Sequence, residues 1–522
     1  MIVTRLVWAV TCAATLASCG WLAGLKSYGL ATDAGDDTGS DASPPGSPSK
    51  PVAMFPWNGY DTGAVDAATS VMPTFTWSAV TGATSYQIEL SVSCAVASSC
   101  DLGDPTLLGS ASAYTPAMPL AAQHSEPVGN RWFWRVGACN DVDCTWSDVR
   151  YLNVGRLASD FDGDGRSDLE IGTSASELWQ FRDGAGSGTI VDNYGSGFGL
   201  AVSTGDFNGD GYGDLAVYAD GTQKQGAIIF IPGGNPVPVV IAGSTPGAQY
   251  GLTSLSPGDL DGDGFDDLVV ITDKNVSVLP GGPTGFGSAS SLMAMGDMVY
   301  ANGFSGVGDV DGDGYPDFAV ASAGGPVTLF YGPLSSNRSA QIPPPNDESP
   351  WGVAITGGDI DGDGFSDVII SANTAAGNGI IYAFHGGPGG VSTVPQQLFA
   401  TTTSGPAFGQ ALLYRREGTS FAIAIGDRTQ AWVSYDLAPP SEIPNQQTGS
   451  TTFGTPLGGG DFAGSGHDSL VIGGTGDESA SHGQSCGAVY MFDVDATGAL
   501  SGHQLDAPDC LANEQFGVAI SH

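Results

Sequence analysis

Short runs in which hydrophobic and polar residues alternate dominate the chain from residue 52 onward, and they predict β-strands. Between residues 52 and 155, the segments Phe75–Trp77, Tyr86–Leu90 and Trp132–Val136 alternate with a period of two, and turn residues separate them. From residue 156, pairs of short β-branched runs recur at intervals of about fifty residues. The predicted fold class is therefore all-β, with a β-sandwich followed by a repeat structure.

Five copies of an acidic segment, D-x-[D/N]-G-D-G-x-x-D, stand between the predicted strands. We name them loops 1 to 5, and they cover Asp160–Asp168, Asp206–Asp214, Asp259–Asp267, Asp309–Asp317 and Asp359–Asp367. Side-chain oxygens at positions 1, 3, 5 and 9, with the backbone carbonyl of position 7, suit one hard cation. Glycine at positions 4 and 6 permits the positive φ angles of a tight turn. The sequence therefore predicts a cation site in each copy.

Calcium is the expected ion, because each loop offers many protein oxygens in a flexible ring. An EF-hand is excluded, since position 12 holds no Glu and strands flank every loop. The expected side-chain ligands are Asp160, Asp162, Asp164, Asp168, Asp206, Asn208, Asp210, Asp214, Asp259, Asp261, Asp263, Asp267, Asp309, Asp311, Asp313, Asp317, Asp359, Asp361, Asp363 and Asp367. The expected carbonyl ligands belong to Arg166, Tyr212, Phe265, Tyr315 and Phe365. About five structural Ca²⁺ ions that brace hairpins are expected, rather than a catalytic centre.

Each loop belongs to a longer repeat. A β-branched strand follows the loop, a second strand such as Gly379–Phe384 follows a Gly-rich turn, and an aromatic-Gly pair such as Tyr250-Gly251 starts the next cycle. The same marks identify two repeats whose loops have lost their acids. In one, Tyr414–Ser420 replaces the loop, and in the other Asp461–Ser469 keeps mainly the glycines. The chain is thus predicted to hold seven repeats.

The order aromatic-Gly, D-x-D-G-D-G-x-x-D, strand and G-x-x-Y-x-F (Gly379–Phe384) resembles the FG-GAP (VCBS) repeat of the integrin α-chain head, over residues 156–522. The resemblance implies a seven-bladed β-propeller of four-stranded blades, with calcium in the hairpin that joins the first two strands of a blade. A closed ring of blades leaves only short exposed edges. The terminal segment Phe516–Ile520 is expected either to complete the first blade or to begin an eighth.

Residues 52–155 are expected to form a separate domain. The stretch that begins at Trp77, continues through Tyr86 and ends with Trp134 and Trp146 resembles a fibronectin type III domain. The resemblance implies a β-sandwich with these aromatic residues in its core. A carbohydrate-binding platform made by the same residues is the alternative.

Residues 1–18 have the features of a signal peptide, since Arg5 precedes an apolar run, Leu6–Leu16, that is too short to span a membrane. The run leads into L-A-S-C-G, which resembles the bacterial lipoprotein signal and implies that Cys19 carries lipid. Gly20 then favours sorting to the outer membrane. An ordinary secretory peptide is the alternative. Residues 19–51 are expected to be a disordered tether because they contain few apolar residues beyond Thr32.

Six cysteines remain after the lipidated one, and an even number in an exported chain indicates disulfides. Proximity in the sequence pairs Cys94 with Cys100, Cys139 with Cys144, and Cys486 with Cys510, although other connectivities are possible. Zinc is disfavoured, because no CxxC pair or histidine cluster accompanies them.

The net charge and the sequence motifs restrict the classes of function that the chain can have. A net charge of −40 excludes nucleic acid as a partner. No HExxH motif is present, so no catalytic residue is assigned and an enzyme is not expected. His385 is interpreted as a turn residue and His467 as facing solvent.

The expected function is adhesion, or binding of a protein or polysaccharide, at the surface of a bacterial cell. The candidate binding segments, on the face opposite the calcium hairpins, are Met293–Asn302, Gln341–Pro350 and Gly473–Gly487. An enzyme or enzyme-associated module that acts on polysaccharide or phosphoester, and a structural subunit of a surface assembly, are the alternatives.

Overall fold

The structure is a computed structural model, and it describes residues 47–521 with internal gaps. The gaps are residues 57, 65–70, 93–101, 103–104, 185–187, 235–236, 244–248, 273–274, 295–302, 323–324, 347, 374–377, 402–407, 418–419, 428, 445–452, 464–467, 478–485, 495–499 and 507–514. The predicted signal peptide, Cys19 and most of the predicted tether therefore lie outside the described residues. Residues 45–522 form one compact unit.

The first part of this unit contains two layers of strands, which pair antiparallel except for the parallel pair β2 and β9. One sheet has the order β1 (Ala53–Phe55), β3 (Phe75–Trp77) and β6 (Ala113–Tyr114). The other has the order β2 (Tyr60–Ala64), β9 (Arg150–Gly155), β7 (Asn130–Cys139), β4 (Ser85–Ser91) and β5 (Thr106–Gly109), with β8 (Cys144–Trp146) paired to β7. Trp77, Tyr86 and Trp134 are buried in the shared core. These three aromatic residues therefore form a core, as expected, whereas Trp146 is only half-buried and lies against Arg135.

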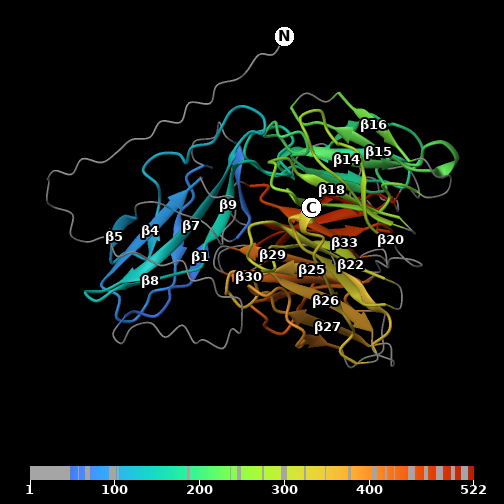
Figure 1. The fold of residues 1–522 in the computed structure, drawn as a ribbon. Helices are drawn as coiled ribbons and strands as arrows, with labels where there is room; N and C mark the ends of the chain where they lie inside the picture. The colour runs from blue at the N-terminus through green and yellow to red at the C-terminus, as the bar shows by residue number, and fades with distance from the viewer. Residues whose placement is uncertain are drawn as a thin grey trace, which may run out of the picture. The chain divides into compact units, whose positions relative to one another are not determined.

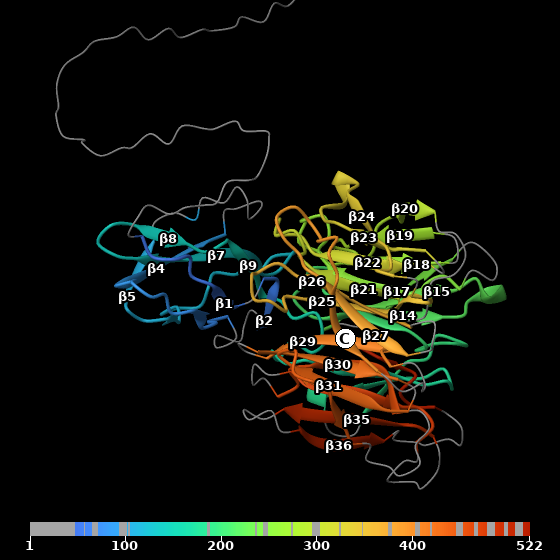
Figure 2. The ribbon, with the colours of Figure 1, turned by 90° about the horizontal axis from the view of Figure 1, so that it is seen from below.

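The remaining described chain folds into seven four-stranded antiparallel sheets, which we number 1 to 7. Figure 1 and Figure 2 show these sheets following one another in chain order, from green (β14) to red (β36). Sheet 1 contains β10 (Leu169–Gly172), β11 (Leu178–Phe181), β12 (Thr189–Val191) and β37 (Ala519–Ile520). Sheet 2 contains β13 (Val202–Gly205), β14 (Asp214–Ala219), β15 (Ala227–Ile231) and β16 (Val239–Ala242). Sheet 3 contains β17 (Ser254–Gly258), β18 (Asp267–Ile271), β19 (Asn275–Leu279) and β20 (Ser290–Ala294).

The other four sheets repeat this order. Sheet 4 contains β21 (Phe304–Gly308), β22 (Asp317–Ala321), β23 (Val327–Phe330) and β24 (Ser339–Ile342). Sheet 5 contains β25 (Trp351–Gly358), β26 (Asp367–Asn373), β27 (Gly379–Phe384) and β28 (Gln396–Ala400). Sheet 6 contains β29 (Ala411–Glu417), β30 (Ser420–Gly426), β31 (Ala431–Tyr435) and β32 (Ser441–Ile443), and sheet 7 contains β33 (Phe453–Gly460), β34 (Ser469–Gly474), β35 (Ala488–Val494) and β36 (Leu500–Asp506).

The middle strands explain why the sheets stack. All residues of β14 and β18 are buried, because apolar side chains on both strand faces meet a neighbouring sheet. One core cluster, for example, joins Ala216 and Ile228 of sheet 2 to Leu268 and Val270 of sheet 3. A single four-stranded sheet could not bury both of its faces, so each sheet depends on its neighbours.

The two ends of the repeat region meet in sheet 1. Strand β37 pairs with β10 through Ile171↔Ile520 and Gly172↔Ala519. Its preceding residue adds a hydrogen bond, because the Val518 N–H donates to the Gly172 carbonyl over 3.2 Å. Two arrangements were expected for Phe516–Ile520, and in the structure this segment completes the first sheet and does not begin an eighth.

One predicted loop is wrong. Tyr414–Ser420 was expected to replace the acidic loop of sheet 6, but Tyr414 lies inside β29 and pairs with Ile423. The strands continue to the pair Glu417↔Ser420, so a short hairpin takes the place of a loop. The short apolar run from Ala411 to Tyr414 fits a buried strand, and the prediction of a replacement for the acidic loop at this point overlooked it.

The structure also shows part of the disulfide pairing and allows a search for membrane-spanning helices. Cys139 and Cys144 form a disulfide that joins β7 to β8, and Cys486 is also disulfide-bonded. Its expected partner Cys510, and the pair Cys94 and Cys100, lie outside the described residues. Among the described residues, no helix is long and apolar enough to cross a membrane.

Candidate metal centres in the acidic loops

The aspartate at position 1 organises each acidic loop. In loop 3, Asp259 Oδ1 accepts the backbone N–H groups of Gly262 (2.6 Å) and Asp263 (3.1 Å), and Oδ2 accepts that of Gly264 (3.0 Å). This turn requires φ angles of 83° at Gly262 and 96° at Gly264, which residues with a β-carbon rarely adopt. The glycines at positions 4 and 6 therefore have the positive φ angles that the sequence predicted.

The aspartate at position 9 ties the loop to the next hairpin of the same sheet. Asp267 is fully buried, its Oδ2 accepts the Leu260 N–H (2.8 Å) and its Oδ1 accepts the Gly281 N–H (2.9 Å). Asp168, Asp317 and Asp367 accept the equivalent pair of N–H groups in loops 1, 4 and 5, and in loop 2 Asp214 accepts those of Asn208, at position 3, and Gly233. Position 9 thus holds two backbone segments together even before any ion is considered.

The carboxylates of four loops converge. Asp160, Asp162 and Asp168 each place an oxygen within 4.8 Å of the others, and so do Asp309, Asp311 and Asp317. Loops 3 and 5 gather positions 1, 3 and 5 in the same way, through Asp259, Asp261 and Asp263 and through Asp359, Asp361 and Asp363. Loop 2 carries Asn208 at position 3, and its amide donates to Asp210 Oδ2 (2.9 Å).

The buried carboxylates of the acidic loops favour a bound cation. Burial, together with neighbouring carboxylates, raises the pKa of Asp267 to about 8 and that of Asp309 to about 7. Two carboxylate oxygens, Asp206 Oδ1 and Asp311 Oδ1, are buried with no hydrogen-bond partner among the described residues. Buried carboxylates that are neither paired nor protonated are costly, so a divalent cation fits these residues.

Position 7 has a second role that the sequence did not reveal. A β-carbon on Gly262 would lie 2.6 Å from the Tyr315 ring, and one on Gly312 would lie 2.3 Å from the Phe365 ring. Tyr212 and Phe265 lie in the same way against the position 4 glycines of loops 1 and 2. Each aromatic side chain therefore packs on the loop before it, which leaves no room for a side chain at position 4.

Backbone hydrogen bonds also link the loops. In loops 2, 3 and 5 the residue at position 8 donates its N–H to the position 1 carbonyl of the preceding loop, as Gly213 does to Asp160 (2.6 Å) and Ser366 does to Asp309 (2.8 Å), whereas Pro316 of loop 4 has no N–H to donate. Ser167 of loop 1 donates in the same way to Asp461 of sheet 7 (3.1 Å). Sheet 7 therefore connects back to sheet 1 at the loops as well as through its neighbour β37.

The position 3 acids of three loops face a cationic or titratable side chain from the same sheet, which the sequence analysis did not identify. Arg182 pairs with Asp162, and Arg338 pairs with Asp311 while it lies over the Tyr331 ring. His385 lies next to Asp361 in loop 5. The interpretation of His385 as a plain turn residue therefore missed its acidic neighbours, because strand pairing and not sequence distance brings them together.

The sandwich strands β7 and β9 reach the acidic loops through three arginines. Arg131 donates to the Gly314 carbonyl (2.7 Å) and pairs with Asp259 (3.5 Å), and Arg156 donates to the Gly264 carbonyl. The buried Arg150 guanidinium lies 3.7 Å from Asp359 Oδ2. In a chain with only 15 Lys and Arg residues, three of them serve this one contact.

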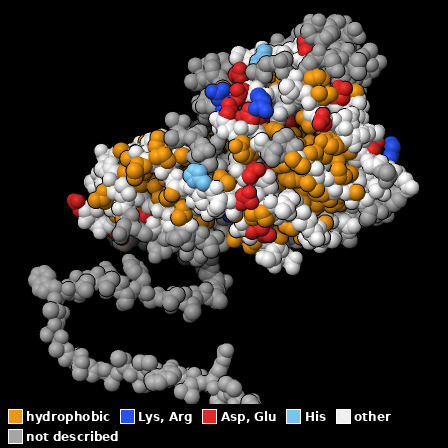
Figure 3. Space-filling view, turned by 90° about the horizontal axis from the view of Figure 1, so that it is seen from above, with side chains coloured by type: hydrophobic (Ala, Val, Ile, Leu, Met, Phe, Trp, Pro, Cys, Tyr) orange, Lys and Arg blue, Asp and Glu red, His pale blue; other side chains and the backbone are white. Residues whose placement is uncertain are grey.

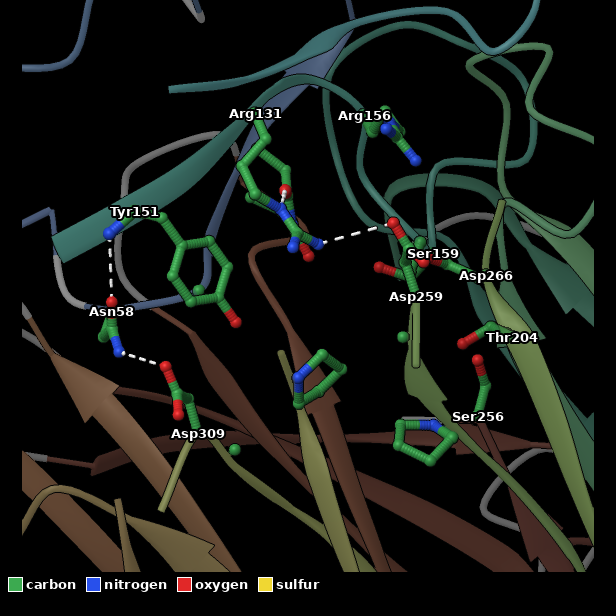
Figure 4. A pocket seen from close by; sticks show the side chains of 18 residues that line it. Asn58, Arg131, Tyr151, Arg156, Ser159, Thr204, Ser256, Asp259, Asp266 and Asp309 are labelled. Carbon is green, nitrogen blue, oxygen red and sulfur yellow. Dashed lines mark hydrogen bonds and ion pairs between the residues drawn. The ribbon is translucent and has the colours of Figure 1, made fainter. Parts of the chain in front are cut away.

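A polar cavity of about 230 Å³ lies beside these arginines (Figure 4). Figure 4 shows Arg131 directed to Asp259, and Asn58 bridging the Tyr151 backbone and the Asp309 carboxylate. Asp61 also lines the cavity, and burial raises its pKa to about 7. The lining mixes both signs of charge and does not by itself identify a ligand.

The candidate ligand-binding segments are only partly described. Residues 295–302 and 478–485 fall in the gaps, and so does His467. Within Gln341–Pro350, Glu348 accepts the Tyr382 hydroxyl (2.7 Å) and the Asn346 backbone N–H (2.7 Å). The surface seen in Figure 3 shows acidic side chains in small groups, few basic ones, and patches of hydrophobic side chains.

Solved structures with similar folds include a virginiamycin B lyase from Staphylococcus aureus, the Dos1 propeller and AofleA from Arthrobotrys oligospora. The lyase matches with 12% identity and a TM-score of 0.32, over 60% of this chain and 91% of its own. The Dos1 propeller matches with 9% identity and a TM-score of 0.35, over 65% and 86%. AofleA matches with 11% identity and a TM-score of 0.34, over 70% and 96%. Similarities this weak say nothing about activity.

Sequence comparison is more informative. Residues 198–231 and 251–290 match the FG-GAP repeat, and residues 309–370 match the FG-GAP-like repeat. Integrin alpha-PS2 of Drosophila melanogaster is 32% identical over 217 residues, which cover 33% of this chain and 15% of the integrin. The match thus spans less than a sixth of that relative's length. Together with the all-β structure, these matches show that the chain carries FG-GAP repeats, within a propeller-like array of four-stranded sheets, and that part of it is similar to an integrin α chain.

Proposed function

We propose that the chain is a lipid-anchored bacterial surface protein whose calcium-stabilised, integrin-like β-propeller binds a protein or glycan ligand. One observation carries the proposal. The same acidic loop recurs in sheets 1 to 5, where it lies between the first and second strands of sheets 2 to 5 and directly before β10 in sheet 1, and its position 1 and position 9 carboxylates hold equivalent backbone groups in four or more copies.

Calcium would be held by the position 1, 3, 5 and 9 side chains and the position 7 carbonyl of each loop. When bound, it supplies positive charge that offsets the burial of several carboxylates. Support comes from the raised pKa of Asp214, which burial brings to about 9, and from the unpartnered Asp311 Oδ1. The loops then act as braces of the fold.

The seven sheets are proposed to be seven blades of a closed ring. The pairing of β37 with β10 and the Ser167–Asp461 hydrogen bond support closure, because both join the first repeat to the chain's last ones. The preceding strands are proposed to be a fibronectin type III-like domain. The sheet orders β1-β3-β6 and β9-β7-β4-β5 support this, as does the core around Trp134.

The proposed ligand-binding face is the end of the sheets away from the acidic loops. The antiparallel order places the connections between successive sheets, such as Gln341–Pro350, at that other end. The three sandwich arginines occupy part of the loop end through Asp259, Gly264 and Asp359. A ligand therefore has freer access to the connections between sheets.

The experiment that tests ligand binding uses the full chain, extracted in mild detergent, on arrays of glycans and of proteins. We expect a saturable ligand in millimolar calcium, and loss of that ligand after chelation. Co-purification of fixed partners in stoichiometric amounts would favour a structural subunit instead. Turnover of a polysaccharide or phosphoester would contradict the binding role.

Membrane attachment needs a separate test. Growth of the producing cells with a clickable palmitate analogue should label the chain and leave a Cys19→Ser variant unlabelled. Equal labelling of both would contradict lipidation at Cys19.

A further inference from the structure

Loop 5 differs from the other acidic loops in the side chain that faces its position 3 acid. The residue in question precedes the glycine or aspartate whose N–H donates to the position 9 carboxylate. In loops 2 and 3 it is Pro232 and Pro280, in loop 1 it is Arg182, and in loop 4 it is Tyr331, whose hydroxyl accepts the Val391 N–H. In loop 5 it is His385, directly after β27. Only the imidazole among these side chains offers a neutral nitrogen ligand to a metal ion.

The imidazole is held in a defined orientation. His385 Nε2 lies 2.6 Å from Gln396 Oε1, so Nε2 carries the hydrogen that the glutamine oxygen accepts. The other ring nitrogen, Nδ1, then points at two carboxylate oxygens, Asp367 Oδ1 at 3.1 Å and Asp361 Oδ2 at 3.3 Å. A neutral ring would direct its Nδ1 lone pair at two anions, which is unfavourable unless a cation lies between them.

The spacing of these atoms suits a small metal ion. Ligands bonded at about 2.1 Å lie about 3.0 Å apart in an octahedron and about 3.4 Å apart in a tetrahedron. The three atoms of His385, Asp361 and Asp367 all lie within 4.8 Å of one another, and the two nitrogen–oxygen distances fall in that interval. The His385 side chain is 30% exposed, so an ion can reach the site from solvent.

We propose that His385 Nδ1, Asp361 Oδ2 and Asp367 Oδ1 form a mixed nitrogen–oxygen site for a divalent first-row transition-metal ion, with water completing its shell. Imidazole favours zinc, cobalt or nickel over calcium, which prefers oxygen ligands alone. Asp361 and Asp367 are also the position 3 and position 9 ligands proposed for calcium in loop 5, so the new site adjoins the calcium position and shares two carboxylates with it. The inference extends the proposed metal-binding role of the loops and makes loop 5 chemically distinct.

The test titrates Co²⁺ into the full chain in excess calcium and follows the visible d–d absorption, with Zn²⁺ added afterwards as a competitor. We expect one equivalent to bind and zinc to displace it. His385→Gln should bind Co²⁺ at least about tenfold more weakly, since it removes the nitrogen ligand. His503→Gln, at an exposed position on β36, is the matched control and should bind as the unaltered chain does.

Three results would overturn the proposal. They are the absence of Co²⁺ binding to the unaltered chain, equal binding by His385→Gln with an unchanged melting temperature, and loss of a calcium ion from His385→Gln in native mass spectrometry. If Co²⁺ does not bind, a protonated, positively charged His385 ring accounts for the two carboxylates beside Nδ1. Calcium counting in the same samples separates the two proposals, because cobalt binding without any calcium would refute the calcium role and leave the histidine site standing.

Discussion

Sheets 5 and 6 connect their first two strands in different ways. In sheet 5, loop 5 joins β25 to β26, and Asp359 and Asp367 hold its backbone. In sheet 6, β29 and β30 pair without interruption to Glu417↔Ser420. The link to the neighbouring sheet is nevertheless kept, since the Tyr414 hydroxyl donates to the Asp359 carbonyl (3.0 Å).

This difference separates two functions of the loop. The link between sheets needs only a donor to the position 1 carbonyl, and a tyrosine hydroxyl can replace the backbone N–H of position 8. The acids are needed where a long turn would otherwise leave backbone N–H groups without partners. Ions are therefore expected to stabilise sheets 1 to 5 and to matter little within sheet 6.

Removal of calcium should have the largest effect. Each ion at a hundred times its Kd adds about 2.7 kcal/mol to the free energy of unfolding, so several ions together should raise the melting temperature by at least several degrees. Differential scanning calorimetry of the full chain with and without chelator checks this. An unchanged melting temperature would remove the ion from the account of loops 1 to 5.

Two substitutions within loop 3 separate the ion from the backbone bonds. Asp267→Ala should lower the free energy of unfolding by about 2–5 kcal/mol, since it leaves the buried Leu260 and Gly281 N–H groups without their acceptor. Asp261→Ala is the control, because its carboxylate accepts only the Asp263 N–H (3.2 Å). In chelator, Asp267→Ala should remain destabilised relative to the parent while Asp261→Ala should not, as measured by urea unfolding. Equal losses for the two variants in chelator would contradict this division.

Asp61 offers a buried acid outside the loops, where no ion is expected. Its raised pKa of about 7 means that the folded state disfavours the ionised carboxylate, so stability is lost as pH rises from about 4 to 7. Asp61→Asn removes this loss and should gain at least about 1 kcal/mol at pH 8, with a smaller gain at pH 5. Unfolding midpoints of both proteins in calcium at the two pH values test it. A difference that does not change with pH would contradict the buried charge.

The smallest effect is expected in sheet 6. Tyr414→Phe removes the hydroxyl that reaches Asp359 and should cost about 0.5–1.5 kcal/mol, with or without chelator. Thermal unfolding in both conditions measures it. A cost that appears only when calcium is present would mean that the tyrosine acts through loop 5 and its ion.

Most of the fold could be predicted from the sequence, because the acidic loops recur at a regular interval along the chain. Strands β3 and β27 have the bounds that were expected, Phe75–Trp77 and Gly379–Phe384, since local sequence patterns mark both of them. Phe516–Ile520 could be placed only as one of two alternatives. Whether it joins β10 depends on a contact across nearly the whole repeat region.

The candidate sites were predicted less completely. Positions 1 to 9 follow from local spacing, whereas Arg182, Arg338 and His385 reach their acids through strand pairing. The contacts of Arg131 with loops 3 and 4 join residues more than a hundred positions apart. No local sequence pattern predicts contacts between residues so far apart in the chain, so these contacts became evident only in the structure.

The number of calcium ions bound by the full chain tests the central claim most directly. Native mass spectrometry should find about five Ca²⁺, and Asp261→Ala or Asp311→Ala should each remove one, because each takes the position 3 ligand from a single loop. Binding of no calcium, or the same number of ions in the parent and in both variants, would contradict the assignment of the acidic loops as calcium braces.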